Sequence, residues 1–372
     1  MNILVSGGHL TPALALIDRL KQTHPEVTVV FAGRSQTQKS TGQPAHEYRL
    51  VTERTNTVFE HFDSGKWGVG NVFYKMEQIG LLGISLPKAI GIVYKYKPKV
   101  FVSFGGYLAV PLAFAAKLLG VPVITHEQTR TAGLSNQVIA KIADQVAVSY
   151  KESLDLFPKN KTVLTGNLIR STIKKATKTP DWFRLKNPKP ILYITGGSQG
   201  SEVINNTVAQ VLPQLLKEFV VIHQCGPKSR SRNYLKELEL TKQKLPLKLR
   251  SHYFVKEWIE EADLAWIYNQ AILVIGRAGA NTVSELKLNA LPAILIPLAI
   301  AHNDEQRKNA LSLVEAGGAV IINQSDLNPE TLIQTLDQVK PNLKQMKANL
   351  KKLPKEKDGV LAFEKLLEKY LK

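Results

Sequence analysis

The first 150 residues alternate short apolar runs with longer stretches in which apolar residues recur at helical spacing. The apolar runs, which predict strands, are residues 3–5, 27–32, 100–104, 121–125 and 145–149. Helical spacing follows the first run as far as Leu20, and a helix rich in small residues is expected to end at Leu119. This alternation is typical of βαβ units that build a parallel sheet.

The rhythm breaks at residues 156–190, which are rich in Pro and Lys, and then restarts. The later apolar runs are residues 191–195, 219–222, 272–275, 293–296 and 319–322, with a helix expected to about Leu216. A length of 372 residues agrees with two domains of roughly 150 residues or more. The fold class predicted is α/β, with two doubly wound, Rossmann-like parallel sheets. Their domains are 1–162, joined by a closing amphipathic helix at about 354–372, and 163–353.

Composition narrows the class of protein. Apolar residues make up 44% of the chain, enough for full cores, which excludes a disordered or fibrous protein. A single cysteine, Cys225, excludes a disulfide scaffold and suits a reducing compartment. The longest apolar run, 290–301, contains two prolines and is shorter than the roughly 18 residues of a membrane span. The first residues also lack the basic lead of a signal peptide, so we expect a cytoplasmic protein.

Charge raises the question of an anionic partner, because 49 Lys and Arg against 31 Asp and Glu give a net charge of +18. Residues 66–99 carry six lysines and one glutamate among large apolar side chains. This segment is either a surface for anionic lipid or a core helix with solvated lysines. Residues 340–357 carry seven lysines and one glutamate and predict a solvated helix face. The proposed membrane patch consists of Lys66, Trp67, Phe73, Tyr74 and Lys75.

Three glycine turns follow predicted strands, at Gly7-Gly8-His9, at Gly105-Gly106-Tyr107 and at residues 196–200. Glycine permits positive φ and close approach of a ligand, and the amides at the following helix start favour a diphosphate. A tight strand-to-helix turn also needs glycine for structural reasons alone. None of the three matches the dinucleotide or P-loop patterns. Three such turns in a two-domain chain favour a site for phosphate or sugar.

The run from Arg277 to Glu285 follows another predicted strand. Asn281 or Thr282 can cap the next helix, and the amides at its start can face a diphosphate. Glu285 can accept two hydrogen bonds from a diol such as ribose, or it can simply interact favourably with the helix dipole. Residues 302–310 are strongly polar, which suits recognition of hydroxyl groups but equally suits an ordinary helix N-terminus.

Taken in order, these motifs resemble those of the MurG-type glycosyltransferases, which add N-acetylglucosamine to lipid I in peptidoglycan synthesis. The resemblance runs from Gly7 to about Asn323 and implies the glycosyltransferase B fold, with the two domains facing a cleft. The stretches that carry it are residues 7–15, 104–107, 126–128, 132–136, 165–170, 196–200 and 277–285.

The resemblance implies that the second domain binds UDP-N-acetylglucosamine. Ser198 would contact the diphosphate, Arg170 the nucleotide, and the Val255 backbone the uracil. Glu285 would hold the ribose, and Gln306 the sugar hydroxyls. The full set implied for the donor is Gly7, Gly8, Thr129, Arg170, Ser198, Val255, Ala280, Asn281, Thr282, Val283, Ser284, Glu285 and Gln306.

The first domain resembles the acceptor and membrane side of the family. His9 is the candidate general base for the acceptor 4-hydroxyl, since a neutral imidazole suits that task; a cap or structural hydrogen bonder is the alternative. Displacement at the anomeric carbon would invert configuration. The resemblance implies a mechanism without metal or cofactor, and the absence of an Asp-x-Asp motif agrees with the lack of a metal. The residues expected on the acceptor side are Gly105, Gly106, Tyr107, His126 and Asn136.

Several positions depart from the family pattern. The first turn has only Gly7-Gly8, where the family has a longer glycine-rich turn. Thr129 stands where the family has Asn, and Glu305 precedes Gln306 where His or Gln is usual. Sugar recognition could therefore shift to Gln306 or Asn136.

Three functions are weighed. The first is formation of lipid II from lipid I by a protein bound peripherally to the cytoplasmic side of the membrane. The second keeps the fold and the UDP sugar but uses a different glycolipid acceptor. The third, a non-enzymatic polyanion-binding protein, rests on the net charge alone and leaves the glycine turns unexplained. The partners expected are therefore the UDP sugar, the lipid-linked acceptor and an anionic membrane, and not nucleic acid.

Overall fold

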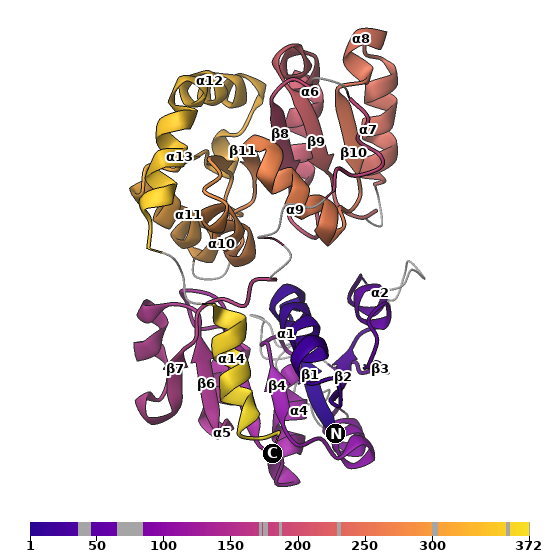
Figure 1. Ribbon diagram of the computed structural model, residues 1–372, viewed down its shortest axis with the longest axis vertical. Helices are drawn as coiled ribbons and strands as arrows, with labels where there is room; N and C mark the ends of the chain where they lie inside the picture. The colour runs from indigo at the N-terminus through magenta and orange to yellow at the C-terminus, as the bar shows by residue number, and fades with distance from the viewer. Residues whose placement is uncertain are drawn as a thin grey trace, which may run out of the picture. The chain divides into compact units, whose positions relative to one another are not determined.

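The computed structural model describes residues 1–35, 46–64, 85–170, 173, 178–185, 188–228, 232–299, 304–354 and 358–371. The chain divides into two compact units, Met1–Arg170 with Glu356–Lys372, and Ser171–Lys355 (Figure 1). The first boundary falls after Arg170, eight residues later than the predicted 162, because the chain there still adds a strand to the first sheet.

The first unit is a parallel sheet of seven strands in the order β3-β2-β1-β4-β5-β6-β7, so the order reverses between β1 and β4. Residues 85–96 are also helical. The elements are β1 (Asn2–Ser6), α1 (Leu10–Thr23), β2 (Thr28–Gly33), α2 (His46–Thr52), β3 (Thr57–His61), β4 (Phe101–Ser103), α4 (Ala109–Leu118), β5 (Val123–Glu127), α5 (Leu134–Ile142), β6 (Gln145–Val148), η1 (Lys151–Leu156), η2 (Lys159–Lys161), β7 (Thr162–Leu164) and the closing α14 (Gly359–Glu368).

The second unit is a parallel sheet of six strands in the order β10-β9-β8-β11-β12-β13, with the reversal between β8 and β11. Its elements are β8 (Ile191–Thr195), α6 (Glu202–Glu218), β9 (Val220–Gln224), α7 (Tyr234–Gln243), α8 (Leu247–Arg250), β10 (Tyr253–Lys256), α9 (Glu261–Gln270), β11 (Ala271–Gly276), α10 (Ala280–Leu288), β12 (Ala293–Leu295), α11 (Glu305–Glu315), β13 (Ala319–Ile321), η5 (Gln324–Asp326), α12 (Pro329–Val339), η6 (Lys340–Asn342) and α13 (Leu343–Lys352).

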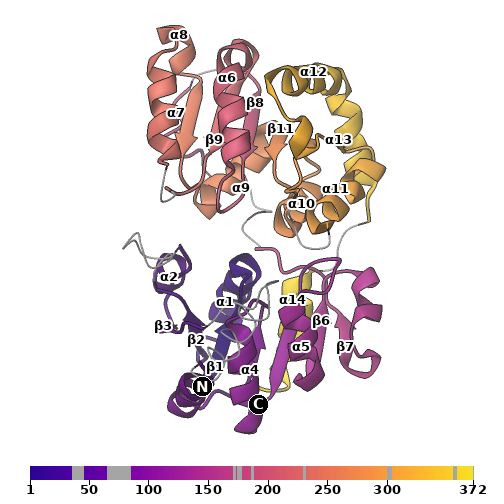
Figure 2. The same cartoon turned by 180° about the vertical axis from the view of Figure 1, so that it is seen from behind.

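Both faces of the second sheet are buried, which explains why its strands are continuous apolar runs rather than alternating ones. Leu192 and Ile194 pack on one face with α6 and α12. Ile191 and Tyr193 pack on the other with α9 and α10. Figures 1 and 2 show these two helical layers from opposite sides.

The closing helix α14 returns to the first unit and lies beside α1 (Figure 1). Phe363 is fully buried, with its ring centroid 5.9 Å from that of Phe104. Glu364 is buried too and accepts a hydrogen bond from Arg19 Nε at 2.8 Å. None of the helices in the described ranges is long and apolar enough to cross a bilayer.

The strand predictions are confirmed except at the edges of the sheets. Residues 156–190 do not form an unbroken connection, because β7 lies within them and pairs with β6. The strands β3 and β10 also lack a predicted counterpart. Both are edge strands in which exposed or half-exposed positions interrupt the apolar pattern.

Candidate active site

Each sheet places its glycine turns where the strand order reverses. In doubly wound sheets, ligands bind at this point, beyond the carboxyl ends of the strands. Gly7-Gly8 and Gly105-Gly106 follow β1 and β4 in the first unit. Residues 196–200 and Gly279 follow β8 and β11 in the second. The two units therefore each carry a candidate ligand site of their own.

The two turns of the first unit touch each other through their backbones. The Gly8 amide donates to the Gly105 carbonyl at 2.9 Å. Gly106 has φ +80°, and a Cβ placed there would lie 2.6 Å from the Gly8 nitrogen. A side chain at Gly106 would therefore push the turns apart, so glycine is required here for structure.

His9 lies between β1 and α1 at the N-cap position of that helix. Its side chain makes no cap hydrogen bond, so the interpretation of His9 as a simple cap is wrong. The residue as a whole is half-buried. Burial of the ring lowers the pKa of His9 below its usual 6.5, and the Glu127 carboxylate opposes that shift. His9 therefore favours the neutral form that can accept a proton.

Glu127, at the end of β5, is a site residue that the sequence prediction missed. Its carboxylate is buried and accepts hydrogen bonds from the Thr129 amide (3.0 Å), the Gly133 amide (2.9 Å) and Asn136 Nδ2 (3.0 Å). These bonds fix the loop from 128 to 133 and the start of α5. The signal available was an acidic residue in the last position of a fully buried strand.

The side chains of Thr129 and Asn136 both form hydrogen bonds within the protein, around the Glu127 carboxylate. The Thr129 hydroxyl lies 2.7 Å from Glu127 Oε1 and also within hydrogen-bond reach of the Thr131 carbonyl. Asn136 Oδ1 accepts from the Thr125 hydroxyl at 2.7 Å. Both side chains are at least nine-tenths buried. Their direct contact with substrate stays a prediction.

His126 is buried in β5 and packs edge-on against the rings of Phe104 and Phe363, which also contact each other. Its Nε2 lies 3.3 Å from the Ser149 hydroxyl and 3.4 Å from the Gly166 carbonyl. Burial lowers the pKa of His126 to about 4, partly offset by the Gly166 carbonyl. The imidazole is thus neutral at pH 7, and its expected contact with the acceptor stays a prediction.

In the second unit, Ser198 is exposed in the turn between β8 and α6. Gly200 has φ +72°, and a Cβ there would overlap the Cys225 carbonyl oxygen at the end of β9. Ser201 caps α6 by accepting from the Ile204 amide at 3.5 Å. Gly200 and Ser201 therefore fix the turn through their contacts with the protein, while Ser198 faces solvent.

The helix α10 begins at Ala280, with Gly279 as its N-cap and no side-chain cap. The prediction that Asn281 or Thr282 caps this helix is wrong, because the extended residue is Gly279 (φ −62°, ψ 151°). Asn281 and Thr282 instead lie in the first turn, partly exposed. An uncapped helix start of this kind is suited to an anion.

Glu285 is buried one turn further into α10, and Val283 and Ser284 are buried beside it. Its Oε2 accepts from the Tyr268 hydroxyl of α9 at 2.9 Å. Gln306, in the first turn of α11, accepts from the Leu298 amide at 3.0 Å and so fixes the loop that follows β12. Ribose and sugar contacts by these two side chains stay predictions.

Arg277 lies directly after β11 and ties three strand ends together. Its Nη2 donates to the Ser201 hydroxyl at 2.8 Å, and its Nη1 donates to the carbonyls of Ile296 (3.0 Å) and Pro297 (3.2 Å). Burial lowers the pKa of its guanidinium. The sequence prediction used Arg277 only to mark a motif, although an arginine at a strand end was the signal.

Comparison with known proteins agrees with this geometry. Residues 6–148 match the glycosyltransferase family 28 N-terminal domain, and residues 191–363 match the glycosyltransferase family 28 C-terminal domain. A relative from Clostridium kluyveri is 32% identical over 98% of this chain and 97% of its own length. The chain belongs to glycosyltransferase family 28.

Two relatives carry the same descriptive name. The Clostridium kluyveri protein and one from Pediococcus pentosaceus, 31% identical over 91% of this chain and 90% of its own length, are each a UDP-N-acetylglucosamine--N-acetylmuramyl-(pentapeptide) pyrophosphoryl-undecaprenol N-acetylglucosamine transferase.

Solved structures extend the comparison to the fold. MurG of Acinetobacter baumannii superposes with a TM-score of 0.69 at 26% identity, covering 99% of both chains. A UDP-glucosyltransferase from Polygonum tinctorium, at 15% identity and a TM-score of 0.64, shares the fold and covers 100% of this chain and 99% of its own. The predicted MurG-type family, glycosyltransferase B fold and enzyme class are confirmed.

The remaining predicted residues of this family 28 chain lie in several places. Arg170 is buried and is the last residue of the first unit. The predicted boundary at 162 placed it in the second domain instead. Val255 lies in the edge strand β10, opposite His223 of β9. The predicted membrane residues Lys66, Trp67, Phe73, Tyr74 and Lys75 lie outside the described residues.

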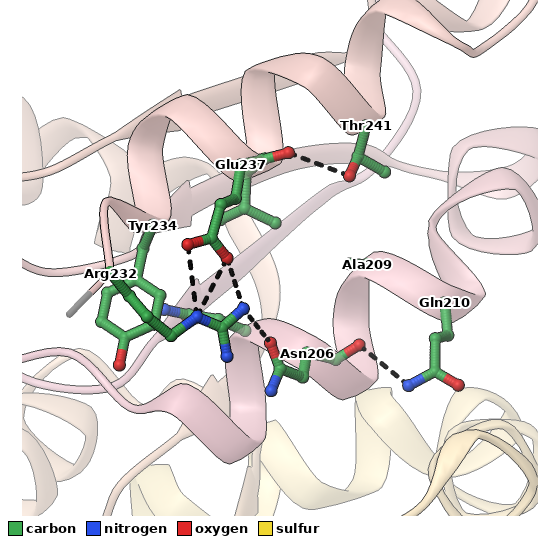
Figure 3. A pocket seen from close by; sticks show the side chains of 9 residues that line it. Asn206, Ala209, Gln210, Arg232, Tyr234, Glu237 and Thr241 are labelled. Carbon is green, nitrogen blue, oxygen red and sulfur yellow. Dashed lines mark hydrogen bonds and ion pairs between the residues drawn. The ribbon is translucent and has the colours of Figure 1, made fainter.

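A surface pocket of about 310 Å³ lies between α6 and α7 of the family 28 C-terminal domain. Figure 3 shows Arg232 reaching Glu237 and Asn206 across it. Arg232 Nη1 also donates to Glu202 at 2.7 Å. The guanidinium is thus satisfied within the protein, and the pocket lies on the helical layer rather than at the strand ends.

Proposed function

We propose that the chain transfers N-acetylglucosamine from UDP-N-acetylglucosamine to the 4-hydroxyl of the muramoyl-pentapeptide of undecaprenyl-diphosphate-linked lipid I, which forms lipid II. The observation that carries this proposal is the 32% identity over 98% of the chain to a relative named for that activity. Similarity of that extent includes both units and both sets of strand-end turns.

The donor is assigned to the second unit. A diphosphate suits the uncapped start of α10 and the exposed Ser198 turn, because helix-terminal amides carry partial positive charge. The buried Glu285 carboxylate, oriented by Tyr268, suits a pair of ribose hydroxyls. Gln306 would recognise the sugar hydroxyls.

The acceptor is assigned to the first unit, with His9 as general base. His9 takes the proton of the acceptor 4-hydroxyl as the oxygen bonds to the anomeric carbon. The bond from that carbon to the UDP oxygen breaks, and UDP leaves with the electron pair. Attack opposite the leaving group inverts the configuration and gives a β-1,4 link. Helix amides stabilise the negative charge on UDP.

The test is transfer by the purified full chain from UDP-N-acetylglucosamine to a short-chain lipid I analogue, with the disaccharide product measured by mass spectrometry. We expect His9→Ala and Glu285→Ala each to lower turnover at least tenfold. Lys344→Ala, on the exposed face of α13, is the control and should retain wild-type turnover. Failure of the wild-type chain to transfer to this acceptor in several detergents and lipids would contradict the proposal.

We also propose that the first unit binds the cytoplasmic face of an anionic membrane through residues 66–99. The described part of this segment is amphipathic. Tyr94 is 70% exposed, while Ala89, Ile92 and Val93 are buried. Its Lys95 is already paired with Glu60 at 2.8 Å, so the other lysines must supply most of the attraction.

Vesicle sedimentation tests this docking. Binding to phosphatidylglycerol vesicles should be strong at low salt and weak at high salt, whereas phosphatidylcholine vesicles should bind little. The double variant Lys66→Glu, Lys75→Glu should weaken binding at least tenfold. The double variant Lys344→Glu, Lys347→Glu makes the same charge change in the second unit and should not. Equal effects of the two variants would contradict a specific docking segment.

A further inference from the structure

Arg34 and Tyr107 lie at strand ends of the first unit, and of the two only Tyr107 is among the residues expected on the acceptor side. Arg34 is the first residue after β2, and Tyr107 follows the Gly105-Gly106 turn after β4. The Arg34 Cζ lies 5.6 Å from the centroid of the Tyr107 ring, in cation–π geometry.

The strand order shows what this contact spans. The sheet runs β2-β1-β4, so β1 lies between the two strands that carry Arg34 and Tyr107. The turn after β1 leads directly to His9. The Arg34–Tyr107 pair therefore reaches across the strand end from which the candidate base emerges.

One donor of the Arg34 guanidinium lacks an acceptor within the described part of the chain. Its Nε is buried and has no hydrogen-bond partner there. A buried donor without a partner costs free energy, so an arriving acceptor group would relieve that cost.

Glu47 orients Arg34 and also interacts with its charge electrostatically. Glu47 accepts a hydrogen bond from the backbone amide of Arg34 at 2.6 Å, which fixes the turn after β2. Burial raises the pKa of Tyr107, so its hydroxyl stays protonated at neutral pH and can donate. Asp63 also acts on Tyr107 electrostatically. The result is a guanidinium stacked on a ring, whose Nε–H has no acceptor among the described residues and can serve an oxyanion.

We propose that Arg34, held on Tyr107, binds an oxyanion of the acceptor substrate and so selects and positions that substrate beside His9. This rests on the proposed function, whose acceptor carries two kinds of anion, a diphosphate and the carboxylates of its peptide. A bidentate guanidinium contact suits either one. Arg34 is thus a specificity residue for the acceptor and not for the UDP sugar.

Steady-state kinetics test the assignment. Arg34→Ala should raise the KM for the lipid I analogue at least tenfold and change the KM for UDP-N-acetylglucosamine less than twofold. Arg34→Lys keeps the charge but not the planar fork and should lie between. Lys141→Ala is the matched control, because it removes one exposed charge from the last turn of α5, at the opposite edge of the same sheet.

Two altered acceptors identify the anion. One carries a monophosphate in place of the diphosphate, and the other has its peptide carboxylates amidated. The penalty of Arg34→Ala should disappear with whichever analogue lacks the recognised group. An equal penalty with both analogues, or an equal rise in the KM for the UDP sugar, would overturn the proposal.

A binding measurement keeps the inference separate from the proposed activity. Calorimetry with the muramoyl-pentapeptide diphosphate, at saturating UDP, should show at least tenfold weaker binding by Arg34→Ala than by the wild type. A wild-type chain that binds this probe but transfers no sugar would contradict the proposed function alone. Unchanged binding in Arg34→Ala, with an unchanged melting temperature, would contradict the inference alone.

Discussion

At the scale of single residues, burial decides the protonation of three histidines. His9 sits at a strand end, and its pKa is lowered by burial against the pull of Glu127. Burial lowers the pKa of His126 to about 4 and that of His223 to about 3. His223 is held neutral between the Tyr253 hydroxyl (2.9 Å) and Asn205 Oδ1 (3.0 Å). The same physical cause therefore prepares a base in one place and a rigid core in two others.

The pH dependence of the reaction should report the protonation of His9. Because only the neutral imidazole accepts a proton, kcat/KM should fall on the acid side with an apparent pKa below 6.5. The measurement is kcat/KM for the lipid I analogue between pH 5 and 8. In His9→Gln the residual activity should lose this acid limb, and an unchanged limb in that variant would exclude His9 as the base.

The buried histidines should also make stability depend on pH. Below about pH 6.5 the unfolded chain takes up protons at His126 and His223 that the folded chain does not bind. The free energy of unfolding should therefore fall as pH drops from 7 to 5, by up to roughly 1.4 kcal/mol per pH unit for each group. Ordinary carboxyl groups remain mostly ionised in this window.

Melting temperatures at pH 7, 6 and 5 measure this effect. His126→Phe should flatten the profile of the first unit, since it removes the titrating imidazole and keeps an aromatic ring beside Phe104 and Phe363. His252→Asn changes a partly exposed histidine and should leave the profile as it is. A wild-type melting temperature that does not fall between pH 7 and 5 would show that the histidines do not control acid stability.

At the scale of elements, the turn from β8 to α6 depends on its contact with the end of β9. Gly200 approaches the Cys225 carbonyl, and Asn205 Nδ2 donates to that same oxygen at 2.9 Å. Arg277 holds the other side of the turn through Ser201. The turn that presents Ser198 is therefore positioned by β9 and β11, neither of which is adjacent to it in sequence.

Gly200→Ala should disturb this turn. The new Cβ would overlap a backbone carbonyl and require a left-handed φ of +72°, so we expect a loss of about 2 kcal/mol or more and at least fivefold weaker UDP binding. Calorimetry measures both quantities. Gly279→Ala is the control, because φ there is −62° and no atom lies within 4 Å of the added Cβ. Glycine is a better N-cap than alanine, so we expect a loss of about 1 kcal/mol or less, smaller than that of Gly200→Ala. Equal losses in the two variants would contradict this account of the turn.

At the scale of the whole molecule, the chain ends by completing the unit in which it began. α14 buries Phe363 against Phe104 and His126, beneath the turns that carry the candidate acceptor site. Arg19, on α1, reaches Glu364 on the same helix. The first unit therefore includes residues separated by more than 300 positions in the sequence.

Phe363→Ala should destabilise the first unit by roughly 3–5 kcal/mol, the usual cost of removing a fully buried phenylalanine. Hydrogen exchange resolved by peptide should show faster exchange in β1, β4 and β5, with little change in the strands of the second unit. Leu361→Ala, on the same helix but 40% exposed, is the control and should have a small effect. Uniform loosening of both units would contradict the assignment of α14 to the first.

Net charge is the other property of the whole molecule. Some of the basic side chains behind the net charge of +18 form ion pairs or hydrogen bonds within the protein. Lys340, in the second lysine cluster, pairs with Asp337 at 2.7 Å and Glu218 at 2.9 Å. Arg277 is buried in hydrogen bonds. The polyanion-binding interpretation treated all of this charge as available to a partner, whereas folding has already committed some of it.

Sequence alone was sufficient for features that depend on neighbouring residues. The central strands are continuous apolar runs because both faces of each sheet are covered, and the glycine turns follow them because backbones must approach closely there. The family could also be identified from its short motifs. Edge strands such as β7 were missed, because half-exposed strands carry a weaker apolar pattern.

Tertiary structure decided the contacts between distant segments. Glu127 holds a loop, Arg277 joins three strand ends, and Arg34 lies over Tyr107 only because the sheet order is β2-β1-β4. Part of the burial that lowers the pKa of His126 comes from Phe363, more than 200 residues away. Burial and hydrogen-bond partners belong to the packed chain, so no local pattern of residues could supply them.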